Sequence, residues 1–256
     1  MRVFLTGASS GIGAALARQF DAHGAEIALI GRNAQKLEEF AERLSHPERH
    51  RTYALDVTDR QALFAAARDF DSQKPVDVVI ANAGISIGMK TEFEEDLDVM
   101  EKVYRTNVFA MASTFHPFIE PMNQRGGGHF VGIASVAGIR GLPGSEAYCS
   151  SKAAAISYLE SLRNDVRKFG INVTTICPGF VRTPLTSKNP YNMPFLLEPD
   201  EFAERAYKAI RSQTTYCTIP WQMAVVGKLL RLLPNYIFDR AVTGRGEKPR
   251  AKELGL

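Results

Sequence analysis

Short runs of apolar residues alternate along the chain with longer amphipathic stretches. The first pair predicts a strand at Val3–Thr6 and a helix over Gly11–His23, which Gly24 ends. An unbroken apolar run such as Val76–Ala81 is typical of a strand that is covered on both faces. Strands that alternate with helices indicate βαβ units. The pattern therefore predicts an α/β fold in which helices flank both faces of a doubly wound parallel sheet.

The same alternation continues to about residue 219. Further strands are predicted at Glu26–Ile30, Arg51–Leu55, His129–Ala134, Ile171–Ile176 and Tyr216–Ile219. Further helices are predicted at Ala34–Leu44, Asp96–Met122, Tyr148–Phe169 and Asp200–Ser212, where apolar positions recur three and four residues apart. Thr58 or Asp59 can cap another helix. We expect the Asp96–Met122 helix to break near Phe115–Pro117, because proline lacks the backbone donor that a helix interior needs.

Composition narrows the class of protein. Hydrophobic residues make up 45% of the chain and charged residues 23%, which is usual for a globular protein, and no linker or repeat divides residues 1–256, so we predict one domain. A net charge of +3 without a Lys/Arg cluster argues against a nucleic-acid partner. Cys149, Cys177 and Cys217 form no metal-ligand pattern, so no metal is expected. With no signal peptide or bilayer-spanning run recognised, we expect a cytoplasmic location.

The junction between the first strand and the first helix is rich in glycine. Glycines there allow a tight turn and let a pyrophosphate approach the backbone, while the helix N-terminus offers free N–H groups. Three glycines alone are weak evidence in a chain that has 20, but their place between a strand and a helix makes them specific. The predicted dinucleotide-binding loop contains Gly7, Ser9, Ser10, Gly11, Ile12 and Gly13.

The loop reads TGASSGIG and resembles that of the short-chain dehydrogenase/reductase family. Five further motifs of that family follow in order, namely Asp56-Val57, Asn82-Ala83-Gly84, Ser135, the YxxxK motif from Tyr148 to Lys152, and the PGxxxT segment from Pro178 to Thr183. The strand motifs stand at predicted strand ends, and together the motifs span most of the chain. The resemblance implies a Rossmann-type, NAD(P)-dependent oxidoreductase that acts on a small-molecule carbonyl or alcohol.

The resemblance also implies roles for individual residues. The catalytic residues would be Asn107, Ser135, Tyr148 and Lys152. The residues that bind the cofactor would be, beside the glycine loop, Arg32, Asn33, Asp56, Val57, Asn82, Ala83, Gly84, Tyr148, Lys152, Pro178, Gly179, Val181 and Thr183. By the same resemblance, Asn107 holds a water that relays protons from Lys152, and Asp56 binds the adenine.

Elementary chemistry supports the catalytic pair independently. Tyr148 and Lys152 are four residues apart, so they share one face of a helix. A tyrosine has a pKa of about 10 and is a poor acid–base group near neutrality, but a neighbouring ammonium favours the phenolate. Ser135 can donate a hydrogen bond to the reacting oxygen. We expect Tyr148 to act as the general acid/base of hydride transfer, although a Tyr/Lys pair seen alone is more often plain surface.

The end of the second strand bears on cofactor choice. Folds that select NAD usually carry an acidic residue there for the ribose hydroxyls. This chain instead reads Ile30-Gly31-Arg32-Asn33. An arginine can pair with a 2′-phosphate, so the sequence favours NADP(H) over NAD(H), unless Arg32 is simply an exposed residue at a helix start.

The C-terminal third carries weaker signals. By resemblance, residues 184–199 form a substrate-covering loop, and its apolar residues favour a partly apolar substrate. Residues 220–256 form a C-terminal extension. Its amphipathic part, Trp221–Phe238, is expected to pack at a subunit interface or over the substrate pocket, with membrane contact the less favoured choice. The charged runs Glu92–Asp96 and Arg245–Lys252 are expected to be solvated surface.

The sequence also bears on the oligomeric state and leaves two alternative functions open. In the family that this chain resembles, subunits pair through the helices predicted here at Asp96–Met122 and Tyr148–Phe169. Candidate interface residues are Phe109, Met111, Phe115 and Tyr158, and we expect a homodimer, or a homotetramer if Trp221–Phe238 adds a second interface. The alternatives are a steroid or lipid-alcohol dehydrogenase with peripheral membrane contact, and a non-catalytic dinucleotide-binding regulator. The presence of both Tyr148 and Lys152 argues against the regulator.

Overall fold

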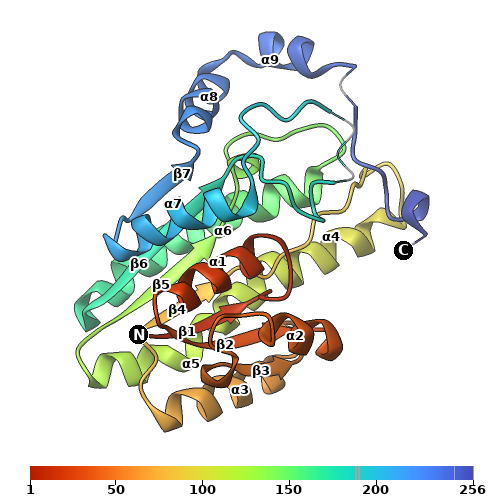
Figure 1. The fold of residues 1–256 in the computed structure, drawn as a ribbon. Coiled ribbons are helices and arrows are strands. Elements are labelled where there is room, and N and C mark those ends of the chain that lie inside the picture. The colour runs from red at the N-terminus through yellow and green to blue at the C-terminus, as the bar shows by residue number, and fades with distance from the viewer. Residues whose placement is uncertain (188, 190, 245, 256) are drawn as a thin grey trace.

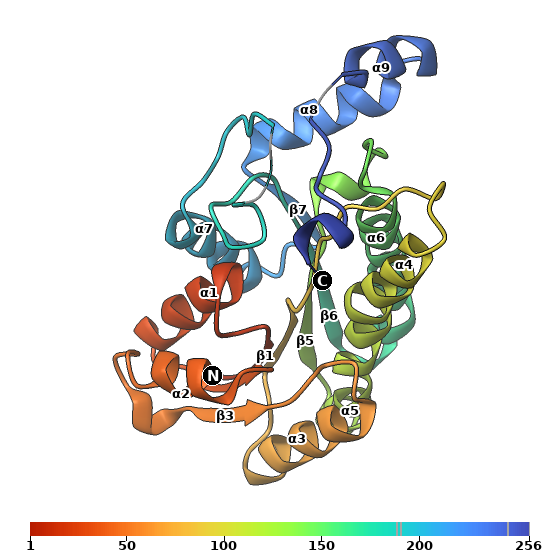
Figure 2. The same cartoon turned by 90° about the vertical axis from the view of Figure 1, so that its right-hand side faces the viewer.

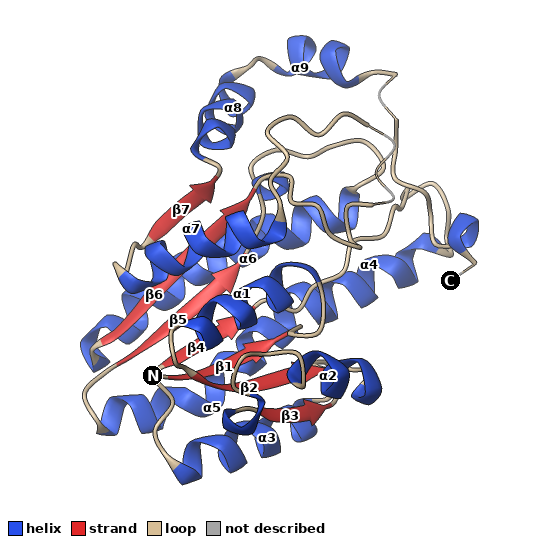
Figure 3. Cartoon of the chain, viewed as in Figure 1, coloured by secondary structure: helices blue, strands red, loops and turns tan. Residues whose placement is uncertain are grey.

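In the computed structural model, residues 1–187, 189, 191–244 and 246–255 are described, and a parallel β-sheet forms their centre (Figures 1 and 3). Its strands are β1 (Arg2–Thr6), β2 (Glu26–Gly31), β3 (Arg51–Ala54), β4 (Val78–Ala81), β5 (Gly128–Ile133), β6 (Ile171–Pro178) and β7 (Tyr216–Ile219). They lie in the order β3-β2-β1-β4-β5-β6-β7, and every neighbouring pair is parallel. The predicted doubly wound sheet is confirmed.

Helices cover both faces of the sheet (Figure 2). One face carries α1 (Gly11–Ala22), α2 (Ala34–Ala41) and α7 (Pro199–Arg211), and the other carries α3 (Arg60–Gln73), α4 (Asp96–Tyr104), α5 (Ala110–Gln124) and α6 (Glu146–Val166). The boundaries differ from the predicted ones by a few residues at most of these helices. Asp59, one of the two predicted caps, accepts a hydrogen bond from the Ala62 N–H (3.0 Å) at the start of α3.

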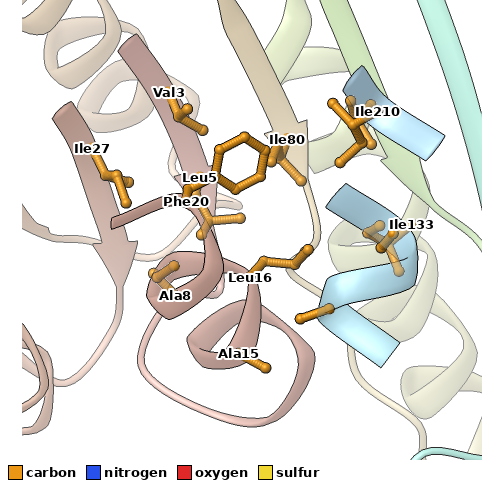
Figure 4. Close-up of a cluster of buried hydrophobic side chains, with 14 of the residues drawn as sticks. Val3, Leu5, Ala8, Ala15, Leu16, Phe20, Ile27, Ile80, Ile133 and Ile210 are labelled. Atoms are coloured by element: carbon orange, nitrogen blue, oxygen red, sulfur yellow. The ribbon is translucent and has the colours of Figure 1, made fainter. Parts of the chain in front are cut away.

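The central strands supply side chains to two cores at once. Val3 and Leu5 of β1 pack with Phe20 of α1, whereas Phe4 between them packs into the opposite core. Figure 4 shows the first of these clusters, with Phe20 lying against Val3, Leu5 and Ile80. Fully burying one such side chain stabilises the fold by about 1.5–3 kcal/mol. This two-sided burial fixes the register in which Leu5 lies opposite Ile80, and so aligns the carboxyl ends of β1 and β4.

The long helix does not break where the sequence suggested. Pro117 lies inside α5, and the interruption occurs earlier, at the π-helical turn η2 (Arg105–Phe109). Phe115 and Phe118 on either side of the proline are fully buried, and their packing holds the helix despite the missing backbone donor. The prediction of a break near Phe115–Pro117 was therefore wrong. The turn at η2 contains Asn107, and π turns are frequent at functional sites.

The segment Trp221–Phe238 forms two helices, α8 (Trp221–Leu232) and α9 (Asn235–Val242). Arg140 holds their junction, because its Nη1 donates to the Leu233 carbonyl (2.7 Å) and its Nη2 donates to Asn235 Oδ1 (3.0 Å). The large apolar side chains left exposed on this pair, called here the apolar crest, are Trp221, Val225, Leu229, Leu232, Tyr236 and Ile237. Within the described ranges, no helix has the length and apolar character needed to cross a bilayer.

Residues 246–255, called here the tail, return from α9 to the body of the protein and reach α4 (Figure 1). Arg250 Nε lies 2.7 Å from Oδ2 of the buried Asp96, and its guanidinium lies 3.4 Å from the centre of the Phe93 ring. A buried carboxylate needs such a partner. The prediction of solvated surface was therefore wrong for Asp96 and for Arg250, whereas Glu92, Glu94, Glu95 and Lys252 of the same runs are exposed. Arg245, the first residue of the second run, and Lys188, Pro190 and Leu256 of the predicted loop and extension lie outside the described residues.

Two of the predicted interface side chains are not available to a partner. Met111 and Phe115 are buried in the core that the sheet forms with α3, α5 and α6. Tyr158 is half-buried, and Phe109 on the π turn is 60% exposed. Sequence spacing could not separate these cases, because α5 and α6 both have apolar positions that face the sheet.

Stability should fall in acid through His129. Its ring lies buried on β5, with Nε2 2.8 Å from Thr174 Oγ1, and burial lowers the pKa of His129 to about 4. Because the unfolded chain protonates this residue below about pH 6.5 and the folded chain resists protonation until about pH 4, the unfolding free energy should drop by about 2 kcal/mol between pH 7.5 and pH 5 through His129.

Urea unfolding at pH 7.5 and at pH 5 measures the contribution of His129 to the unfolding free energy. His129→Gln should flatten the pH dependence by that amount, and His116→Gln, which removes an exposed imidazole, is the matched control. An unchanged dependence in His129→Gln would contradict the assignment.

Candidate active site

The loop between β1 and α1 has a backbone that only glycine suits at two positions. Gly7 adopts a left-handed φ of +69°. A Cβ atom on Gly13 would lie 2.0 Å from the Gly7 carbonyl oxygen, so any larger residue would push α1 away from the loop. Ser10 precedes α1 without a side-chain cap, and the first turn of the helix contains no acidic residue. The N–H groups of that turn can therefore face an anion.

A clasp of hydrogen bonds ties this loop to the end of β4. Asn82 Nδ2 donates to the carbonyl oxygens of Thr6 (2.9 Å) and Gly7 (3.2 Å). In return, Thr6 Oγ1 accepts from the backbone N–H groups of Asn82 and Ala83, both at 3.1 Å. β1 and β4 are the strands at which the sheet reverses its order, where α/β sheets bind ligands.

A cavity of about 590 Å³ opens at this edge of the sheet. The predicted residues that line it are Gly7, Ser9, Ser10, Gly11, Ile12, Arg32, Asp56, Val57, Asn82, Ala83, Gly84, Ser135, Tyr148, Lys152, Pro178, Gly179, Val181 and Thr183. An extended ligand with an anionic centre suits it, because the cavity runs past a helix N-terminus from Arg32 to Tyr148. The residues present thus fit a dinucleotide.

Three predicted residues do not line the cavity. Gly13 lies behind the loop, against the Gly7 carbonyl. Asn33 caps α2, since its Oδ1 accepts from the Lys36 N–H (2.8 Å). Asn107 is fully buried behind the wall of the cavity. All three thus shape the site from outside it.

Arg32 and Asp56 stand at the far end of the cavity. Arg32 Nη1 lies 4.0 Å from Asp56 Oδ2, and both side chains are largely exposed. Asp56 Oδ1 also accepts from the backbone N–H (2.9 Å) and the hydroxyl (2.7 Å) of Thr58. Burial alone would raise the pKa of Asp56, but the Thr58 hydrogen bonds and the Arg32 charge outweigh it and hold this pKa below its usual range. This end therefore offers a carboxylate and a guanidinium.

Tyr148, Ser135 and Lys152 meet at the opposite end. Tyr148 and Lys152 lie on α6, with the lysine Nζ 5.9 Å from the centre of the tyrosine ring. Lys152 is buried and donates to the Ile133 carbonyl (2.8 Å), which fixes its ammonium below the end of β5. Ser135 follows that strand, and its Oγ accepts from the Ala137 N–H (3.1 Å).

Burial dominates the titration of this group. It raises the pKa of Tyr148 to about 12, although the hydroxyl of Ser135 acts in the opposite direction. It lowers the pKa of Lys152 to about 8. The site therefore holds a protonated phenol and an ammonium that releases its proton readily.

Asn107 braces the wall beside them. Its Nδ2 donates to the Ile85 carbonyl and to Ser151 Oγ, both at 3.0 Å, and its Oδ1 accepts from the Ile85 N–H (2.9 Å). Gly84 lies directly beside Asn107, and a larger residue there would crowd its amide. The position where a Cβ on Gly84 would stand lies 3.2 Å from Asn107 Oδ1 and 3.5 Å from Lys152 Nζ.

Some lining residues have no signal in the sequence. Ser86 and Ile87, and Lys102 and Thr106, also face the cavity. They belong to a loop and to helix faces whose side chains could be placed only by the tertiary structure. Lys248 of the tail is not part of this lining, but its Nζ lies over the Tyr148 ring, and the sequence carried no signal for that contact either.

The short chain dehydrogenase family model matches residues 1–193. The chain belongs to that family. A relative named "Uncharacterized oxidoreductase" from Myxococcus xanthus is 36% identical over 239 residues, which cover 93% of this chain and 94% of the relative. Human "Estradiol 17-beta-dehydrogenase 11" is 30% identical over 91% of this chain and 79% of its own length.

A solved structure agrees with these relatives. The crystal structure of a 3-oxoacyl-[acyl-carrier protein] reductase with bound NAD from Brucella melitensis is 27% identical, covers 85% of this chain and 88% of its own, and superposes with a TM-score of 0.75. The protein is thus an oxidoreductase of the short-chain dehydrogenase family, with the Rossmann-like fold by which that family binds NAD(P).

Proposed function

We propose that the protein is an NADP(H)-dependent oxidoreductase that interconverts a carbonyl compound and its alcohol, with Tyr148 as general acid/base. The observation that carries the proposal is the meeting of Ser135, Tyr148 and Lys152 at one end of the cavity that the glycine loop and Arg32 also line. A donor for the reacting oxygen, a titratable phenol and a buried cation there form the set that such a reaction needs.

The chain's own groups account for cofactor binding in this proposal. The glycine loop and the N-terminus of α1 would hold the pyrophosphate, Asp56 would bind the adenine, and Arg32 would pair with the 2′-phosphate. The segment from Pro178 to Thr183 and Lys152 would hold the nicotinamide end. When bound, the dinucleotide supplies or accepts the hydride.

Protons would move through Tyr148. In carbonyl reduction the protonated phenol, whose pKa burial raises, donates its proton to the reacting oxygen, which Ser135 polarises. Lys152 then stabilises the phenolate and returns a proton to it. By resemblance to the family, a water held by Asn107 would resupply the lysine. Asn107 thus serves by placing that water and by holding the Ile85 backbone.

The segment 184–199 completes the proposed site. We propose that residues 1–256 form one domain in which this loop covers the substrate. Leu185 and Thr186 of the loop line the cavity, and Tyr191 packs edge-on against Phe180 with ring centres 6.3 Å apart. The loop lining favours a substrate with an apolar portion.

The apolar crest supports a second candidate, a lipid-alcohol dehydrogenase that rests on a membrane surface. Leu232 and Trp221 are 81% and 68% exposed, and contiguous exposed apolar surface usually marks a contact. Lys228 and Arg231 lie on the same helix and could meet anionic lipid headgroups. Cosedimentation with anionic vesicles, lost in Leu229→Asp, would favour this candidate.

Tyr148→Phe should abolish turnover while cofactor binding stays nearly intact, because the ring still packs but has no proton to exchange. We expect kcat to fall by about 10²–10⁴-fold on the best substrate from a panel of ketones, aldehydes and quinones. NADPH oxidation and NADPH titration measure the two effects. Tyr158→Phe, on the same helix and away from the cavity, is the control. Near-parental kcat in Tyr148→Phe would overturn the role.

Arg32→Ala should weaken NADPH binding far more than NADH binding. Loss of a charge-assisted contact to the 2′-phosphate corresponds to about 1.5–3 kcal/mol, or about 10- to 150-fold in Kd. Fluorescence titration with both cofactors measures the ratio. The exposed Arg43→Ala variant should bind both as the parent does. Equal losses, or a parent that prefers NADH, would contradict NADP(H) selectivity.

We also propose at least a homodimer. The exposed Leu97 and Phe109 on α4 and the π turn, together with the apolar crest, leave apolar surface that self-association would bury. Light scattering at micromolar concentration should give a mass of twice 28.3 kDa or more. Phe109→Asp and Leu229→Asp then identify the contact. A single species near the chain mass would contradict the assembly.

A further inference from the structure

The tail brings a second lysine to the proposed acid–base group. Lys248 Nζ lies 4.8 Å from the centre of the Tyr148 ring, nearer than the 5.9 Å of Lys152 Nζ. It donates a hydrogen bond to Ser86 Oγ, and both Ser86 and Tyr148 line the cavity. Its ammonium therefore stands next to two residues of the cavity lining, Ser86 and Tyr148. Lys248 lies beyond the 193 residues that match the family model.

The tail is held on both sides of this lysine. Gly88 N–H donates to the Pro249 carbonyl (3.2 Å), and a Cβ on Gly88 would lie 2.3 Å from the Lys248 carbonyl oxygen. Further along, Arg250 is paired with the buried Asp96. The close contact with Gly88 and the ion pair of Arg250 hold the backbone on both sides of Lys248. The fold therefore fixes the position of its ammonium.

The surroundings of this ammonium provide no counter-charge. The groups that face it are Ser86 from the loop after β4 and Tyr148 and Cys149 from α6. Its neighbour Glu247 is paired with Lys90 at 2.8 Å. Within the described ranges, no carboxylate lies within 4 Å of Lys248, and only one of its three donors is used. Burial lowers the pKa of Lys248 to about 8, as expected of a cation without an anionic partner.

An uncompensated cation beside a reacting centre is costly unless a ligand pairs with it. We propose that Lys248 is the residue that recognises the substrate's charge, and that the substrate is an oxo acid or hydroxy acid whose carboxylate lies a few bonds from the reacting carbon. This inference rests on the proposed reaction at Tyr148. With the carbonyl oxygen at Tyr148 and Ser135, a nearby carboxylate reaches the ammonium, and the apolar remainder extends toward Leu185 and Tyr191.

The test compares oxo acids, with carboxylates at increasing distance from the ketone, with their methyl esters. The parent should prefer the acid form at the best distance. Lys248→Met should lower kcat/KM for that acid by about 10- to 100-fold, mainly through KM, because the lost contact binds ground state and transition state alike. The ester should react as with the parent. Lys252→Met, an exposed residue of the same tail, is the charge-matched control.

The pH dependence gives a second readout. The ammonium is present below its pKa, so KM for the acid should rise as pH increases through about 8, while KM for the ester should not. Lys248→Arg should extend tight binding to higher pH, because a guanidinium stays protonated up to about pH 12. A purely structural lysine would not produce this difference between acid and ester.

The outcomes distinguish a failure of the proposed reaction at Tyr148 from a failure of the recognition role of Lys248. If the parent reduces neither acids nor esters, nor any other carbonyl, the proposed reaction itself fails. If the parent reduces both forms equally well, or if Lys248→Met loses both to the same extent, the reaction stands and the recognition role of Lys248 is overturned.

Discussion

The clasp between the ends of β1 and β4 is the constraint on which the site depends. Two amide hydrogen bonds from Asn82 hold the Thr6 and Gly7 carbonyls, and Thr6 Oγ1 holds the backbone after β4. Buried side chains on both faces of these strands set their register, so the clasp closes only in one arrangement. The cavity, the glycine loop and the position of Gly84 beside Lys152 all follow from it.

Charge is unevenly distributed along the cavity. The end near Arg32 is exposed, and its charges are shared with Asp56 and solvent. At the other end, Lys152 is buried against the Ile133 carbonyl and Lys248 is held by the tail next to Ser86. The electrostatic interactions of buried lysines are stronger than those of exposed ones, because little water screens them. The tail, although remote in sequence, thereby places a cation 4.8 Å from the centre of the Tyr148 ring.

The sequence was sufficient for what depends on local spacing. The four-residue interval from Tyr148 to Lys152, the glycine loop and the strand-end positions of Asn82 and Ser135 follow from helix and strand periodicity. The site residues that it suggested lie together around one cavity, apart from Gly13, Asn33 and Asn107, which shape it from behind. Their roles remain predictions.

What the sequence could not supply depends on contacts between distant segments. Pro117 stays helical because Phe115 and Phe118 are buried, and no local rule contains that information. The run that includes Lys248 and Arg250 resembled solvated surface until the pairing with Asp96 showed where the tail goes. The exposure of the apolar crest also depends on such distant contacts. The amphipathic pattern of Trp221–Phe238 predicted an apolar face, but not how much of it stays exposed.

The central claim is that the cavity holds NADPH next to Tyr148 and that a carbonyl is reduced there. A single-turnover incubation with NADPH that carries deuterium at both hydrogen positions of nicotinamide C4 tests this directly, with the product analysed by mass spectrometry. If hydride is transferred from NADPH to the carbonyl carbon, one deuterium should appear on that carbon of the product. Tight binding of NADPH without transfer of deuterium to any class of carbonyl compound would contradict it.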